Sequence, residues 1–227
     1  MIDVPKASQR ATADDHPLAQ PARAFLFADL HGSTALYERI GDAAGYEIVR
    51  RYFAFVAGIV GDNDGVVVKT IGDAAMATFA NSPDAVKAAL ALQARIATFD
   101  RAHSEADADR FAMKLGIHCG DSVRVRLGNR FDYFGFAVNM AARLQGLSLN
   151  GDVVLSRTVA EHPGVRPLLA AVPTLEQRLH LRGVEGVVRV VRVLSAAGHQ
   201  TWCRPSNPTP MRSAARAPPT SLALGGY

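Results

Sequence analysis

Two aspartates stand at the ends of apolar segments whose pattern is typical of strands. Asp29 follows the apolar run 24–28, and Asp73 lies between the apolar stretches 66–71 and 74–79. If these segments form neighbouring strands, the two carboxylates lie within reach of shared metal ions, and a two-metal site on a triphosphate needs such a pair. Taken singly, each residue has a simpler explanation, since Asp29 could cap a helix and Asp73 could serve an ordinary turn.

The residues after Asp29 favour a short helix. Ser33 is a suitable N-cap after Gly32. The first N–H groups of a helix have no partner within it, so the backbone at Gly32, Ser33 and Thr34 would offer donors to an anion. A carboxylate beside such donors suits a magnesium ion and the phosphates that it carries. We therefore expect phosphate binding at this helix start.

A third polar group lies in the segment 132–143. Asn139 and Arg143 are four residues apart on a predicted helix over 136–147, so they share one face. An amide beside a guanidinium suits a ribose ring and a phosphoryl group. A solvated polar face explains either residue alone, but it fits less well for both in a segment rich in Ala, Met and Val.

Residues 23–194 alternate between predicted strands and helices. The dipeptide Gly72-Asp73 suits a tight hairpin, and hairpins exclude an all-parallel sheet. The pattern predicts an α+β fold of the ferredoxin-like type, a mostly antiparallel sheet with packed helices. Strands are predicted at 24–28, 66–71, 74–79, 111–119, 123–127, 153–155, 175–181 and 187–194, with the main helices at 48–60, 83–97 and 136–147.

The composition is typical of a soluble globular protein, because 48% of the 227 residues are hydrophobic and 20% are charged. We expect residues 1–22 to be a disordered leader or linker and 195–227 a disordered tail, because both lack apolar periodicity. Much of the net charge of +4 comes from arginines of that tail, and no basic stripe with aromatics indicates nucleic-acid binding. No apolar run is long enough for a membrane span, so we expect a cytoplasmic protein.

Together these motifs resemble the catalytic domain of class III adenylyl and guanylyl cyclases. The resemblance covers nearly all of 23–194 and keeps the order of every motif. It rests on Asp29 with the Gly-Ser-Thr that follows, Lys-Thr-Ile-Gly-Asp at 69–73, Gly-Ile-His at 116–118 and the segment from Asp132 to Arg143. Two features differ from many members: the segment 120–132 is short, and Ser33 stands where phenylalanine is common.

The resemblance implies a role for each polar residue. It implies that Asp29 and Asp73, with the carbonyl of Leu30, hold two Mg²⁺ or Mn²⁺ ions. By the same resemblance Asn139 would orient the ribose and Arg143 would stabilise charge on the α-phosphate. The implied product is a cyclic nucleotide, made with release of pyrophosphate at sites shared by a homodimer.

By the same resemblance, Lys69 and Asp132 would read the base. Adenine offers an acceptor at N1 and donors at its 6-amino group, which match an ammonium and a carboxylate, whereas guanine inverts both. ATP is therefore the expected substrate, and 3′,5′-cyclic AMP the expected product. Two alternatives remain at this point, a guanylyl cyclase and a nucleotide-binding regulatory domain with little catalysis.

Overall fold

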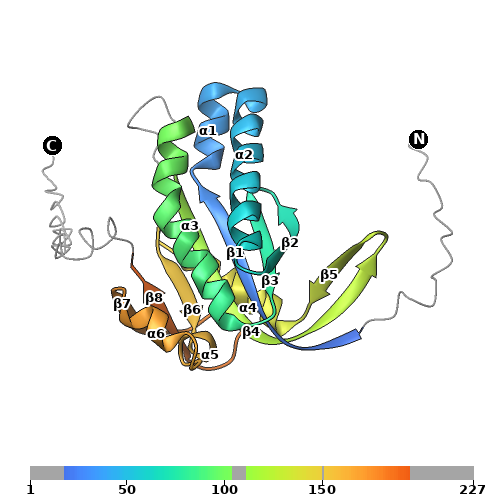
Figure 1. Ribbon diagram of the computed structural model, residues 1–227, viewed down its shortest axis with the longest axis vertical. Coiled ribbons are helices and arrows are strands. Elements are labelled where there is room, and N and C mark those ends of the chain that lie inside the picture. The colour runs from blue at the N-terminus through green and yellow to red at the C-terminus, as the bar shows by residue number, and fades with distance from the viewer. Residues whose placement is uncertain (1–17, 104–110, 150, 195–227) are drawn as a thin grey trace, which may run out of the picture.

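The computed structural model describes residues 18–103, 111–149 and 151–194. These residues form one sheet with helices on both of its faces (Figure 1). The strands are β1 (Leu18–His31), β2 (Gly65–Ile71), β3 (Ala74–Phe79), β4 (Ala112–Leu127), β5 (Arg130–Phe134), β6 (Val153–Ser156), β7 (Thr174–Leu179) and β8 (Val188–Val193). The helices are α1 (Ser33–Ile40), α2 (Asp42–Gly61), α3 (Ser82–His103), α4 (Phe136–Gly146), α5 (Arg157–Ala160) and α6 (Arg166–Ala170).

The strand order is β2-β3-β1-β4-β6-β8-β7, and β5 pairs with β4 outside this path. All pairs are antiparallel except β4 with β6. This mixed, mostly antiparallel sheet with packed helices confirms the predicted α+β class.

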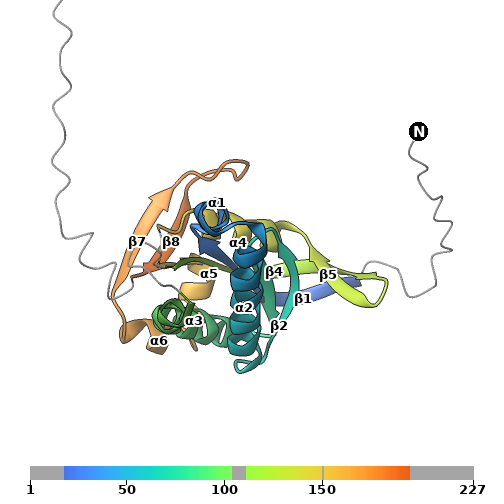
Figure 2. The same cartoon turned by 90° about the horizontal axis from the view of Figure 1, so that it is seen from above.

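The central strand β1 is buried on both faces, as its continuous apolar run predicted. Leu26 and Leu30 point into the main core against α2 and α3, and Phe25 and Phe27 pack against α4 on the opposite face. Burial of such side chains stabilises the fold by roughly 1.5–3 kcal/mol each. Because side chains alternate along a strand, Asp29 lies on the same face as Phe27, toward α4. Figure 2 shows the layers from above.

Three strands differ from the sequence prediction, and one of them, β5, was not predicted at all. β1 begins at Leu18 rather than near residue 24, because the residues from Leu18 to Gln20 pair with Arg124, Val123 and Ser122 of β4. For the same reason β4 runs unbroken where two shorter strands were predicted. Of the predicted leader 1–22, residues 1–17 lie outside the described residues, and the part from Leu18 onward belongs to β1. The predicted tail 195–227 also lies outside the described residues.

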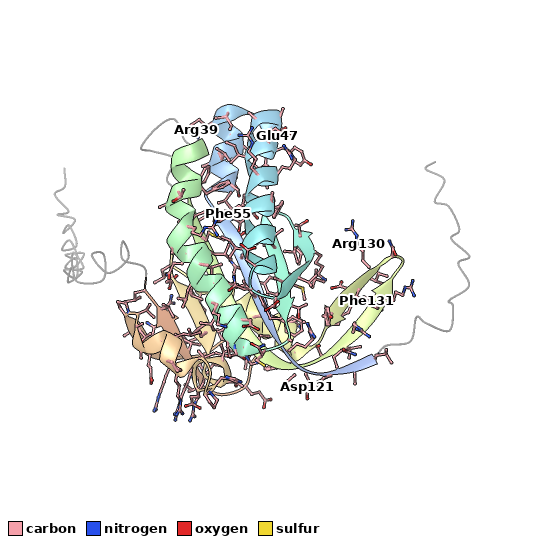
Figure 3. The ribbon with its side chains drawn as sticks, viewed as in Figure 1. Arg39, Glu47, Phe55, Asp121, Arg130 and Phe131 are labelled. Carbon is pink, nitrogen blue, oxygen red and sulfur yellow. The ribbon has the colours of Figure 1, made fainter. Side chains whose placement is uncertain are left out.

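The hairpin of β4 and β5 projects from the body of the sheet (Figure 1). Phe131 and Arg130 lie toward its outer end (Figure 3). Among the residues that the structure describes, no helix combines the length and hydropathy that crossing a membrane would require.

Candidate active site

The β2–β3 hairpin brings the two predicted metal ligands together. Asp29 pairs with Ala74 in the β1–β3 register, and Asp73 immediately precedes Ala74 in the turn. Burial raises the pKa of Asp29, and the negative charge of Asp73 and a hydrogen bond between the two carboxyl groups raise it further. Lys114 and Gln145 partly offset this rise in the pKa. The two carboxyl groups thus form a close pair whose negative charges repel.

Each carboxylate also accepts a hydrogen bond from a neutral side chain. The Ser33 hydroxyl donates to Asp73 Oδ2. Gln145 Nε2 donates to Asp29 Oδ2 at 3.1 Å. Neither bond follows from sequence spacing, because both join residues from distant parts of the chain. Both donors belong to helices, Ser33 to α1 and Gln145 to α4.

The predicted N-cap of α1 is corrected by the structure. The N-cap is Gly32, in a left-handed conformation with φ 88°, and α1 begins at Ser33. No side chain of the described residues caps this helix, since the Ser33 hydroxyl bonds to Asp73 instead. The first N–H groups of α1, from Ser33 and Thr34 onward, lack partners within the helix. Leu30, whose carbonyl was predicted to assist the metals, has a buried side chain and lies between Asp29 and this turn.

The two residues predicted to read the base form an ion pair. Lys69 Nζ lies 2.6 Å from Asp132 Oδ2. Asp132 Oδ1 accepts a hydrogen bond of 2.7 Å from the backbone N–H of Tyr133, which fixes the orientation of the carboxylate. The ammonium of Lys69 also lies 5.2 Å from the centre of the Phe134 ring, a cation–π distance. A donor and an acceptor thus stand side by side in a partly buried position.

Asn139 and Arg143 both belong to α4. Asn139 is exposed, and Arg143 is half-buried. A guanidinium nitrogen of Arg143 lies 3.2 Å from where a Cβ would stand on Gly183, in the turn between β7 and β8. Among the described residues, no hydrogen bond or ion pair joins Asn139 or Arg143 to Asp29 or Asp73 of the same chain.

Exposed apolar side chains gather on the hairpin and at the start of α4. Phe131 is 50% exposed and Phe136 is 58% exposed, whereas such rings are normally buried. We call this group the hairpin apolar surface; it consists of Val123, Leu127 and Phe134 on one face of the hairpin, Phe131 on the other face, and Phe136 at the start of α4. The guanidinium carbon of Arg124 lies 4.6 Å from the centre of the Phe131 ring, so a cation accompanies this ring on its face of the hairpin.

Comparison with known sequences places these residues in a family. A model of the adenylate and guanylate cyclase catalytic domain matches residues 20–180. The chain is 36% identical over 151 residues to adenylate cyclase 2 of Rhizobium meliloti, covering 60% of this chain and 40% of that protein. It is 30% identical over 148 residues to an adenylate cyclase of Streptomyces coelicolor, covering 65% and 36% respectively. The chain thus spans less than half the length of these relatives.

Solved structures agree on the fold. The adenylyl cyclase CyaB from P. aeruginosa superposes with a TM-score of 0.69 at 20% identity, covering 80% of this chain and 97% of that one. The guanylyl cyclase Cya2 gives a TM-score of 0.69 at 18% identity, covering 79% and 94%. The match over residues 20–180 includes all the motifs discussed above. The chain therefore belongs to the adenylate and guanylate cyclase catalytic domain family.

Proposed function

We propose that this chain is an adenylyl cyclase, which converts ATP to 3′,5′-cyclic AMP and pyrophosphate at sites formed by two copies of the chain. The Lys69–Asp132 pair carries the choice of ATP. The ammonium has three donors and the carboxylate two acceptor oxygens, so both keep capacity for the base while they bond each other. Guanine would present a proton to Lys69 and a lone pair to Asp132, and such mismatched buried groups discriminate strongly.

The donor set around Asp29 and Asp73 fits Mg²⁺ or Mn²⁺. Both ions prefer oxygen ligands, and a divalent cation would stabilise the ionised form of Asp29, whose pKa is raised by burial and then by the charge of Asp73. Within the described ranges, no group of three or more His, Cys, Asp or Glu side chains could hold a metal by itself. The phosphates of the nucleotide would have to complete the coordination, as is common for Mg²⁺. When bound, such ions stabilise charge on phosphate oxygens and lower the pKa of a nearby hydroxyl.

The remaining residues orient the nucleotide for an in-line displacement. The N–H groups at the start of α1, from Gly32 to Thr34, bind phosphate oxygens and hold the triphosphate next to Asp29 and Asp73. Asn139 orients the ribose, and Arg143 stabilises the charge on the α-phosphate. The ribose 3′-oxygen, having lost its proton to water, attacks the α-phosphorus. The bond from that phosphorus to the β-phosphate oxygen breaks, and pyrophosphate leaves.

A second copy of the chain supplies Asn139 and Arg143 to this site. Among the described residues, the side chains bonded to Asp29 and Asp73 within one chain are Gln145 and Ser33 rather than Asn139 or Arg143, which agrees with this arrangement. The hairpin apolar surface supports it as well, because large exposed rings next to α4 are typical of a surface that a partner covers. A two-fold dimer would then hold two equivalent sites.

Complementation between two inactive variants tests this proposal. Asp73→Ala removes a metal ligand, and Arg143→Ala removes the guanidinium that would act in the other subunit's site. In a mixed dimer one site collects both lesions and the other collects neither. With random exchange, about a quarter of the wild-type cyclic AMP formation should return. If no activity returned although labelled subunits had exchanged, the shared site would be wrong.

A further inference from the structure

Gln145 lies on α4, the helix that also carries Asn139 and Arg143, and its side chain contacts Asp29, a predicted metal ligand. Its side-chain amide donates to Asp29 Oδ2 at 3.1 Å. Gln145 is half-buried at the last turn of α4. The Gln145 amide therefore bonds to the Asp29 carboxylate in partly desolvated surroundings, where a hydrogen bond is stronger than in water and so orients the carboxylate.

A glycine makes this reach possible. A Cβ on Gly116 of β4 would lie 2.0 Å from the backbone nitrogen of Gln145, so only glycine lets α4 rest directly on the strand. Gly116 pairs with Phe27 of β1, and Asp29 lies two residues further along on the same face. The contact at Gly116 thus sets the last turn of α4 beside Asp29.

We propose that Gln145 is a positioning residue that holds the Asp29 carboxylate in place for the metal pair. The inference rests on the proposed function, since it gives Gln145 a part in the same site. Outer hydrogen-bond partners of metal-binding carboxylates orient them, and their loss typically costs 10–100-fold in metal affinity or activity. The geometry further assigns Gln145 to the site that contains Asp29 of its own chain.

The assignment separates Gln145 from its neighbour Arg143. Two residues along a helix differ by about 200° in direction, so the two side chains leave α4 on nearly opposite sides. Arg143 lies against Gly183, whereas Gln145 bonds to Asp29. In the proposed dimer, α4 would then serve Asp29 of its own chain through Gln145 and the partner's site through Asn139 and Arg143.

Metal binding without turnover tests the first part of the proposal. The probe is Mn²⁺ with 3′-deoxy-ATP, which lacks the attacking hydroxyl, and the readout is the Mn²⁺ concentration that half-saturates the rise in melting temperature. Gln145→Met, which keeps the length and loses the donor, should need about 10-fold more Mn²⁺. Gln93→Met is the matched control, because Gln93 Nε2 bonds only to the carbonyls of Gly151 and Val193 among the described residues.

The control should lower the melting temperature and leave the Mn²⁺ requirement unchanged. An equal Mn²⁺ requirement in Gln145→Met and the wild type would overturn the role of Gln145 alone. If Asp29→Ala were stabilised by Mn²⁺ as well as the wild type, the metal site itself would be wrong, and the role of Gln145 with it.

Mixed dimers test which site Gln145 serves. The intact site of the complementation pair uses Asp29 and Asp73 from the Arg143→Ala chain and Arg143 from the Asp73→Ala chain. Adding Gln145→Met to the Arg143→Ala chain should lower the recovered activity about 10-fold at limiting Mn²⁺. Adding it to the Asp73→Ala chain should change that activity far less. The reverse pattern would show that Gln145 acts by placing Arg143, and would overturn the proposal.

Discussion

The ammonium of Lys69 lies 2.6 Å from Asp132 Oδ2, so a residue of β2 and a residue of β5 form one ion-paired unit. Two further contacts orient this pair. The backbone N–H of Tyr133 donates to Asp132 Oδ1, and the Phe134 ring lies at a cation–π distance from the Lys69 ammonium. Because its donor and acceptor are fixed relative to one another, the unit would present one hydrogen-bonding pattern to the base in the proposed site.

Reversing that pattern should reverse the substrate preference. In the double variant Lys69→Glu with Asp132→Cys, an acceptor replaces the ammonium and a weak donor replaces the carboxylate. We expect kcat/KM for ATP to fall by at least about 100-fold and GTP to become the better substrate. Steady-state kinetics with each nucleotide checks this, and an unchanged preference for ATP would show that other residues read the base.

Asp29→Asn should stabilise the metal-free fold while it removes activity. The pKa of Asp29 is raised in the folded chain, mainly by burial and then by Asp73, so the folded chain holds this proton more tightly than the unfolded chain. The stability that this proton gives is therefore present at low pH and is lost as the pH rises through the raised pKa. Asparagine does not ionise, so the variant should melt higher than the wild type at pH 7 and should lose that advantage near pH 3.

Activity should fall by more than about 100-fold in the same variant, because loss of a ligand costs more than loss of its outer partners. Thermal unfolding without metal at the two pH values, together with a cyclase assay, tests both effects. Asp62→Asn, at an exposed loop aspartate, serves as the control. Equal melting temperatures of the wild type and Asp29→Asn at pH 7 would contradict the repulsion inferred between Asp29 and Asp73.

Ser33→Ala should weaken metal binding by the Asp73 carboxylate. The Ser33 hydroxyl donates to Asp73, so its loss frees that carboxylate to adopt other rotamers. We expect about a 10-fold rise in the Mn²⁺ concentration needed for half-maximal activity. Ser156→Ala removes another buried serine hydroxyl, on β6, and should not change the Mn²⁺ requirement. The same Mn²⁺ dependence in Ser33→Ala as in the wild type would remove any role for this bond.

Local sequence signals predicted the strands and helices that carry the site more accurately than they predicted the contacts between those elements. The Gly72-Asp73 turn and the apolar stretches that flank it predicted β2 and β3 within one residue of their bounds. The early start of β1 was missed because it depends on pairing with β4, about a hundred residues later along the chain. Pairing of this kind leaves no periodic signal in a segment that contains Pro17 and Pro21.

The donors to the two carboxylates were missed for a related reason. Gln145 reaches Asp29 only because α4 rests on Gly116, and the one available signal was an isolated glycine within a predicted strand. Ser33 was interpreted as a helix cap, since a serine after a glycine fits that role locally. Its actual acceptor, Asp73, lies forty residues away. Contacts between distant segments follow from tertiary packing, which spacing along the chain does not encode.

The product formed from a mixture of nucleotides tests the central claim most directly. The purified chain is incubated with Mn²⁺ and equal concentrations of ATP and GTP, and both cyclic products are separated by chromatography and identified by mass. The account predicts 3′,5′-cyclic AMP in at least about 100-fold excess over cyclic GMP, and loss of both products in Asp73→Ala. Cyclic GMP in equal or greater amount, or no cyclic product from a chain that demonstrably dimerises, would contradict it.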